Sequence, residues 1–170
     1  MGEPFDFEIP ESEGVVMTSA AGLSHMDLAL GEGRAAAARG EVPVGAVLVG
    51  PTGAVLAKAG NRTREWNDPT AHAEIVVIRE ACKALGQERL TGCDLYVTLE
   101  PCPMCAAAIS FARIRRVYFA AGDPKGGGVE HGPGIFNQPT CHHAPEVYSG
   151  LGEAEAAALL RTFFSERRGD

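Results

Sequence analysis

Short apolar runs alternate with segments of helical spacing along most of the chain, and this alternation limits the fold more than any other feature. The runs VPVGAVLV (42–49) and AVLAKAG (54–60), separated by GPTG, predict a β-hairpin. CDLYVTL (93–99) and RRVYFAA (115–121) predict two further strands. Every run except the second strand of the hairpin is apolar without interruption, which is typical of strands covered on both faces. The sequence therefore predicts a layered α/β domain.

Four other segments carry the spacing and the end signals of helices. They are MDLALGEGRAAAARG (26–40), DPTAHAEIVVIREACKAL (68–85), CPMCAAAISFARI (102–114) and EAEAAALLRTFFSERR (153–168). The first should stop near Gly40, and the second offers Asp68 and Thr70 as capping residues. Pro103 is tolerated in the first turn of the third helix. The fourth is amphipathic, and the glycine- and proline-rich stretch 122–145 is expected to be a long loop.

The charge of the chain is concentrated at its beginning. The net charge is −7, but residues 1–25 hold five acidic residues and no lysine or arginine, so the other 145 residues carry only −2. Residues 1–25 also lack a sustained apolar period, so we expect a flexible acidic tail there and a single domain over 26–170. The alternative is an ordered extension lying on the domain. The near-neutral body neither supports nor excludes an RNA partner.

Length and cysteine content narrow the class of protein further. No apolar run reaches the roughly 18 residues of a membrane span, and no secretory leader is expected. The five cysteines are an odd number in a chain too long to need disulfide staples. We therefore expect a cytoplasmic protein with reduced thiols, whose closely spaced cysteines are metal ligands or catalytic groups.

Two of these cysteines, Cys102 and Cys105, lie three residues apart at the expected start of a helix. This spacing puts both sulfurs on one side of the helix, where the helix dipole favours thiolates. His72, in the first turn of another predicted helix, supplies a third ligand, and three ligands with one open position are typical of catalytic zinc. Glu74 leaves that helix in a different direction, so it can act as a proton carrier near the metal without binding it.

Other interpretations of the same residues stay open. A closed structural zinc site would need a fourth ligand, for which Cys141, His142 and His143 are available. A redox-active cysteine pair would need neither the histidine nor the glutamate. Without its neighbours, Glu74 would be an ordinary solvated carboxylate.

The order His-x-Glu followed by Pro-Cys-x-x-Cys, here His72 to Glu74 and Pro101 to Cys105, is the signature of zinc-dependent nucleobase deaminases. The chain resembles one family of that superfamily more widely, the bacterial tRNA-specific adenosine deaminases. The resemblance covers residues 26–168. It rests on EVPVGAVLV (41–49), DPTAHAEI (68–75), LYVTLEPCPMCAAA (95–108) and RTFFSERR (161–168).

The resemblance implies both a fold and a reaction. The fold would be the three-layer α/β/α cytidine deaminase-like arrangement around a mixed five-stranded sheet. His72, Cys102 and Cys105 would bind one Zn²⁺ per subunit, and zinc-bound hydroxide would attack C6 of adenine. Glu74 would take a proton from the zinc-bound water, deliver it to the purine ring and then protonate the departing amine, which gives inosine and ammonia. This is tRNA adenosine(34) deaminase activity, directed at the wobble position of the anticodon.

The resemblance also implies partners and substrate contacts. The protein would be a homodimer that acts in the cytoplasm on the anticodon stem-loop of a tRNA, without a membrane. The residues expected to contact the substrate are Asn61, Val44, Ala71, Asp123, Lys125 and His142, the last at the place of an asparagine in relatives. Lys125 is a candidate phosphate contact, with plain surface charge as the alternative.

Two other functions stay open. IREACKALG (78–86) and EPCPMC (100–105) also resemble guanine deaminases, so the same chemistry would then act on a free base or nucleoside of the guanine or cytosine type. The third hypothesis is a non-catalytic zinc-binding partner subunit, although such proteins commonly lose the proton carrier that Glu74 would provide.

Overall fold

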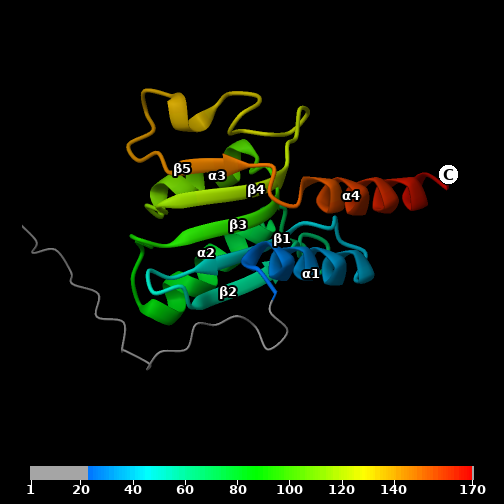
Figure 1. Cartoon of the computed structure of the whole chain (residues 1–170), viewed down its shortest axis with the longest axis horizontal. Coiled ribbons are helices and arrows are strands. Elements are labelled where there is room, and N and C mark those ends of the chain that lie inside the picture. The colour runs from blue at the N-terminus through cyan, green and yellow to red at the C-terminus, as the bar shows by residue number, and fades with distance from the viewer. Residues whose placement is uncertain (1–22, 170) are drawn as a thin grey trace, which may run out of the picture.

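The computed structural model describes residues 23–169, which form a five-stranded sheet with helices on both faces (Figure 1). The elements are α1 (His25–Ala38), β1 (Gly45–Val49), β2 (Val55–Gly60), α2 (Ala73–Leu85), β3 (Asp94–Leu99), α3 (Pro103–Phe111), β4 (Arg116–Ala121), the 3-10 helix η1 (Ile135–Asn137), β5 (Glu146–Ser149) and α4 (Glu153–Arg168). Most of the expected acidic tail, residues 1–22, lies outside the described residues, so its flexibility stays a prediction.

The sheet is mixed, and its strand order is β2-β1-β3-β4-β5. β1 runs antiparallel to both of its neighbours, whereas β3, β4 and β5 run parallel to one another. The predicted hairpin and the two predicted strands are all present, and the expected mixed five-stranded sheet is confirmed.

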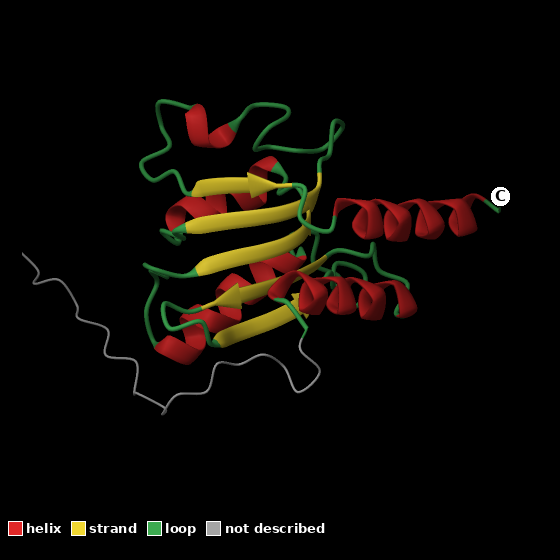
Figure 2. Ribbon diagram, viewed as in Figure 1, coloured by secondary structure: helices red, strands yellow, loops and turns green. Residues whose placement is uncertain are grey.

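Two apolar cores lie on opposite faces of the sheet and give the fold its three layers (Figure 2). Helix α1 lies on one face, and α4 contacts α1, β3 and β4 on that side before it runs beyond the ends of the strands; α2 and α3 cover the other face. The larger core packs the inward side chains of the strands against α2 and α3. The apolar side predicted for α4 is only partly buried, because Ala156 lies in the smaller core whereas Phe164 is exposed. None of the helices in this described part combines the length and the apolar character that crossing a membrane would require.

The strand directions bring four chain segments to one edge of the sheet. Because β2, β3 and β4 all point the same way and β1 points the opposite way, the chain leaves three strands and enters the fourth at this edge. The residues there are Asn61 after β2, Glu100 after β3, Asp123 after β4 and Val44 before β1. Such an edge, beyond the carboxyl ends of strands, is where open α/β sheets bind ligands.

Close packing of α1 on the hairpin depends on two glycines. Gly45 and Gly60 face each other across β1 and β2. A Cβ on Gly45 would lie 1.9 Å from the Ala29 carbonyl oxygen, and one on Gly60 would lie 2.7 Å from the Glu32 carbonyl oxygen. Any larger residue would therefore push α1 away from the strands that form one wall of the site edge.

Two local expectations from the sequence need correction. Asp68 and Thr70 do not cap α2, because Asp68 instead accepts hydrogen bonds from the backbone N–H and hydroxyl of Thr70. His72 is the N-cap residue and makes no side-chain capping bond. The stretch 122–145 is a loop as expected but contains η1. It is followed by β5, whose four residues are too few and too exposed to show a strand period.

The glycine packing generates a stability prediction. We expect Gly45→Ala to lower the free energy of unfolding by about 2–3 kcal/mol, because the clash is with rigid backbone. Gly31→Ala is the matched control on α1, where an added Cβ meets nothing within 4 Å. It should be neutral or stabilising by up to about 1 kcal/mol. Urea denaturation of both variants measures this, and equal stabilities for the two would contradict the packing described.

Candidate metal centre and active site

Three metal-binding side chains meet where two helices begin. His72 is the N-cap of α2, Cys102 is the N-cap of α3, and Cys105 lies in the first turn of α3. The His72 Nδ1 atom is 3.6 Å from the Cys102 Sγ and 3.4 Å from the Cys105 Sγ. All three ligand atoms lie within 4.8 Å of one another. The sequence prediction that these residues converge is therefore confirmed.

The spacing of these atoms fits zinc. Tetrahedral zinc, with Zn–S of about 2.3 Å and Zn–N of about 2.0 Å, separates a sulfur ligand from a nitrogen ligand by about 3.5 Å. The two observed S···N distances agree with that value. Two thiols and an imidazole also form a donor set that zinc prefers. The three residues thus suit a zinc ion with one coordination position left for a non-protein ligand.

The three groups are coupled through their protons. A hydrogen bond with the Cys105 thiol lowers the pKa of Cys102 to about 4. The same hydrogen bond, together with burial, raises the pKa of Cys105. A hydrogen bond with Cys102 raises the pKa of His72. Zinc requires thiolates and a neutral imidazole, so metal uptake must release protons, and metal affinity should fall as the pH is lowered.

Glu74 is the second residue of α2, and it is not one of the three clustered metal-binding side chains. Its side chain is buried, with 4% of the residue exposed, and burial raises the pKa of its carboxyl group. The sequence prediction placed a proton carrier here, near the metal and not bound to it. A buried carboxyl group in this position is suited to accept and to return a proton.

A cavity of about 260 Å³ opens over these groups. Its lining residues come from all four segments at the sheet edge, and they are Val42, Val44, Asn61, His72, Glu74, Leu99, Glu100, Cys102, Asp123 and Gly126. Three of the residues expected to contact a substrate, Val44, Asn61 and Asp123, therefore lie at the metal site. The cavity is a concave site with apolar and polar walls, beside a carboxyl group whose pKa is raised, which is the usual form of an active site.

Asn61 has a defined orientation in this cavity. Its Oδ1 atom accepts a hydrogen bond of 2.9 Å from the backbone N–H of Ala73, the first residue of α2. Asn61 therefore supplies the capping oxygen that Asp68 and Thr70 were expected to supply. No other described residue accepts a hydrogen bond from its Nδ2 group, so Asn61 offers a hydrogen-bond donor at the cavity.

The other predicted substrate contacts do not line this cavity, and the Asp123 carboxylate, which does, also binds backbone groups of its own loop. The Asp123 carboxylate accepts hydrogen bonds from the backbone N–H groups of Lys125 and Gly126. Lys125 is exposed, and Ala71 is buried next to His72. His142 lines a different cavity, of about 250 Å³, beside α3. The proposed roles of Ala71, Lys125 and His142 in substrate binding stay predictions.

Sequence reasoning missed two buried carboxylates beside the cavity, Glu100 and Glu41. Glu100 follows β3 and accepts backbone N–H bonds from Asp123, Val129, Glu130 and His131. The His131 Nδ1 atom lies 2.5 Å from it as well. Glu100 thereby holds the glycine-rich loop against the metal site. The sequence does carry a signal for them, because each is a single acidic residue directly beside an apolar run: Glu100 follows YVTL, and Glu41 precedes VPVGAVLV.

The alternative of a closed structural zinc site is not supported by the arrangement of Cys141 to His143. The Cys141 thiol donates to the His143 carbonyl oxygen at 3.2 Å. The His143 Nε2 group donates to the Ile114 carbonyl oxygen at 2.7 Å. Across residues 23–169, the only group of three suitable side chains placed to hold a metal is His72, Cys102 and Cys105.

Comparison with known proteins agrees with this geometry. Residues 21–121 match the model of the cytidine and deoxycytidylate deaminase zinc-binding region. The tRNA-specific adenosine deaminase of Agrobacterium fabrum is 70% identical over 145 residues, which are 85% of this chain and 95% of that protein. A solved structure from a study of A-to-I editing by tRNA:A34 deaminases is also 70% identical, with a TM-score of 0.79, and covers 80% of this chain and 98% of that one.

The guanine deaminase of Bacillus subtilis has a similar but more distant structure. It is 34% identical, with a TM-score of 0.57, and the match covers 85% of this chain and 92% of that chain.

The ligand geometry predicts which cysteine binds metal. We expect Cys105→Ser to weaken zinc binding by more than about a hundredfold, because it removes one of three protein ligands. Cys141→Ser, the matched control, should keep about one zinc per chain, as wild type does. Elemental analysis of the purified proteins measures both. Loss of zinc from the Cys141 variant would contradict the assignment.

Proposed function

Since the chain belongs to the tRNA-specific adenosine deaminases, we propose that it converts adenosine to inosine at the wobble position of a tRNA anticodon. The observation that carries the proposal is the three-ligand metal site beside a buried carboxyl that is not a ligand. Hydrolytic deamination needs an activated water molecule and a group that moves its proton. The reaction consumes adenosine and water and releases ammonia.

The cofactor is one zinc ion per subunit, and His72, Cys102 and Cys105 would hold it. When bound, zinc supplies the Lewis acidity that activates a water molecule for attack on the base. Glu74 takes the proton of that water on its carboxylate and transfers it to a ring nitrogen of adenine. The carboxylate then takes the second proton, from the hydroxyl group that has been added to C6, and gives it to the amine, which leaves as ammonia. Burial of Glu74 keeps bulk water from competing for this proton.

Asn61 orients the base in this proposal. Its Oδ1 atom is taken by the Ala73 N–H, so its Nδ2 group is the part available to the substrate. A purine ring nitrogen that lacks a proton accepts such a bond. Val44 contributes apolar surface to the same cavity, and Asp123 lines it from the loop after β4. The proposed substrate contacts also include three residues that do not line this cavity, namely Ala71, Lys125 and His142.

The tRNA substrate is favoured over a free base. Guanine deaminases share the fold at 34% identity, whereas a tRNA-specific adenosine deaminase and a structure from a study of tRNA:A34 deaminases are 70% identical over nearly their whole length. Contact with the anticodon stem-loop would place phosphates near exposed Lys125 at the mouth of the site. We also propose a cytoplasmic location, since all five cysteines are free thiols.

We further propose that the protein is a homodimer that uses the outer face of α3. Phe111 is 76% exposed at the end of this helix, and Met104 lies on the same face two turns earlier. The adjoining cavity beside η1 adds Ala107 and Ile135 to this surface. Apolar side chains gathered on one helix face are typical of an interface core.

The first test is the formation of inosine. Wild-type protein should convert adenosine to inosine in an anticodon stem-loop, and Glu74→Gln should lower the rate by at least about a hundredfold while it keeps its zinc. Chromatography of the digested RNA, with elemental analysis, measures both quantities. Full turnover by the Gln variant would refute the role of Glu74. Turnover of guanine or cytosine with none of RNA would move the proposal to a free base.

The second test concerns the subunit contact. Phe111→Glu should weaken the dimer by at least about tenfold, because it places a charge in an apolar interface. Leu151→Glu is the control, because Leu151 is also exposed but lies outside α3. Sedimentation velocity over a concentration series compares them with wild type. A strictly monomeric wild type, or equal weakening by both variants, would rule out this interface.

A further inference from the structure

The second buried carboxylate, Glu41, lies in the segment between α1 and β1 and has only 1% of its surface exposed. Its oxygens accept hydrogen bonds from the backbone N–H of Glu65 at 2.8 Å and of Arg64 at 3.0 Å, and from the hydroxyl of Thr63 at 3.2 Å. Within residues 23–169 it forms no ion pair. Burying a carboxylate costs free energy unless hydrogen bonds compensate its charge. The bonds from residues 63–65 provide that compensation, so the buried position of Glu41 depends on this loop.

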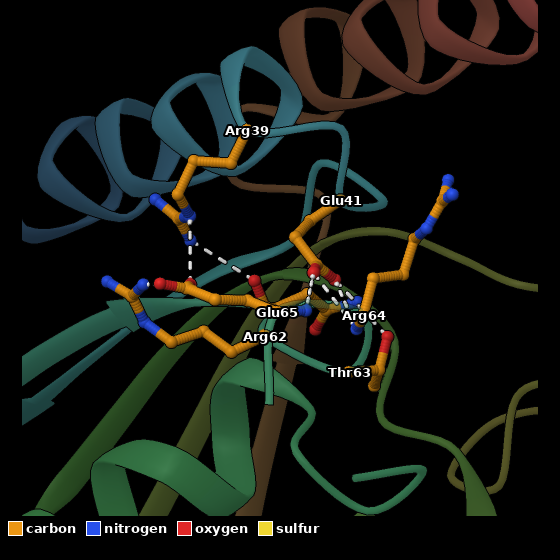
Figure 3. Close-up of polar contacts among 7 residues, drawn as sticks. Arg39, Glu41, Arg62, Thr63, Arg64 and Glu65 are labelled. Atoms are coloured by element: carbon orange, nitrogen blue, oxygen red, sulfur yellow. Dashed lines mark hydrogen bonds and ion pairs between the residues drawn. The ribbon is translucent and has the colours of Figure 1, made fainter. Parts of the chain in front are cut away.

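Figure 3 shows how selective this contact is. Glu41 meets the backbone of the loop, whereas the side chain of Arg64 is directed away from the carboxylate. Arg39 and Arg62 pair with the side chain of Glu65 at the outer side of the same loop. The arginines near Glu41 therefore do not neutralise it, and its partners are the donors that the loop itself exposes.

The loop in question, residues 61–72, carries one site residue at each end. It begins with Asn61, which offers its Nδ2 group to the cavity, and ends with the metal ligand His72. A hydrogen bond of 3.0 Å from the Arg62 N–H to the Ala71 carbonyl oxygen closes the loop. Fixing the residues just after Asn61 therefore fixes the direction in which Asn61 leaves β2.

Glu41 also connects this loop to the segment before β1, which lies beside it and lines the same cavity. The next residues along its segment, Val42 and Val44, line the cavity. The Val44 carbonyl oxygen accepts a hydrogen bond of 3.1 Å from the Asn61 N–H. Arg39, two residues before Glu41, donates to the Asn61 carbonyl oxygen at 3.1 Å. Both sides of the Asn61 backbone are thus held by the segment that contains Glu41.

From these contacts we propose that Glu41 is a positioning residue for the deamination reaction, which acts on the substrate through Asn61. It does not line the cavity over the metal and has no contact with the metal ligands. Its carboxylate holds residues 63–65 so that the Asn61 amide is presented to the base. This inference rests on the proposed function, because its readout is turnover of the RNA substrate.

Glu41→Gln is the informative substitution. It keeps the size of the side chain but exchanges one acceptor oxygen for an NH₂ group, which would face donors of the loop. We expect kcat/KM for the stem-loop to fall by about tenfold or more, as for one misplaced hydrogen-bond group. Zinc content should stay at one per chain, and the KM-against-kcat pattern should reproduce that of Asn61→Ala.

A double-mutant cycle separates positioning from general stability. If Glu41 acts through Asn61, Glu41→Gln in the Asn61→Ala background should change kcat/KM by less than about twofold. Glu65→Gln is the matched control, because it breaks the exposed ion pairs of the same loop and leaves the Glu41 bonds in place. It should leave kcat/KM within about twofold of wild type.

Each result of these experiments either supports or overturns the role proposed for Glu41. Additive effects of the two substitutions, or loss of zinc from Glu41→Gln, would overturn the proposal. If Glu41→Gln does not fold, Thr63→Val removes one bond to the carboxylate and should give a smaller loss, of about threefold, that again vanishes in the Asn61→Ala background. A wild type that does not deaminate the RNA would refute the proposed function itself, which the cycle alone does not test.

Discussion

The convergence of two helix N-termini at one edge of the sheet is the constraint on which the rest of the structure depends. His72 and Cys102 are the N-caps of α2 and α3, and Cys105 lies one turn along α3. Helix starts expose unpaired N–H groups and partial positive charge, which stabilise thiolates there. The strand directions of β1, β3 and β4 bring both helix starts, the cavity and Glu74 to the same edge. Metal ligation and proton transfer thus follow from one topological arrangement.

Two buried carboxylates complete this arrangement by holding the loops beside the cavity. Glu100 holds the loop after β4 through four backbone N–H groups, and Glu41 holds the loop after β2. Each replaces the regular hydrogen bonds that an irregular loop lacks, and each does so at a wall of the cavity. The walls are therefore fixed by charge-assisted bonds, while the apolar cores fix the sheet and helices.

Much of this could be predicted from the sequence because the signals are local. The zinc ligands lie on helix starts that are marked by spacing and by Pro103, and Glu74 follows from its offset to His72. The Asn61 bond to Ala73 spans a loop, and the Glu41 bonds join segments more than 20 residues apart, so no periodicity reports them. Asp68 does not have the capping role expected for it, because Asn61, at the end of β2, accepts the hydrogen bond from the first N–H of α2. The residue pattern alone did not locate β5, because three of its four residues are exposed, and a fifth strand was expected only from the family resemblance.

The central claim is that the site keeps one coordination position open beside Glu74. X-ray absorption at the zinc edge of the purified protein tests this most directly, because it counts the sulfur and the lighter ligands of the ion. We expect two sulfur ligands and two nitrogen or oxygen ligands, of which one is the imidazole of His72. The same shell should persist in Glu74→Gln. A third sulfur ligand, or a second imidazole in the wild-type shell, would show a closed site and contradict the account.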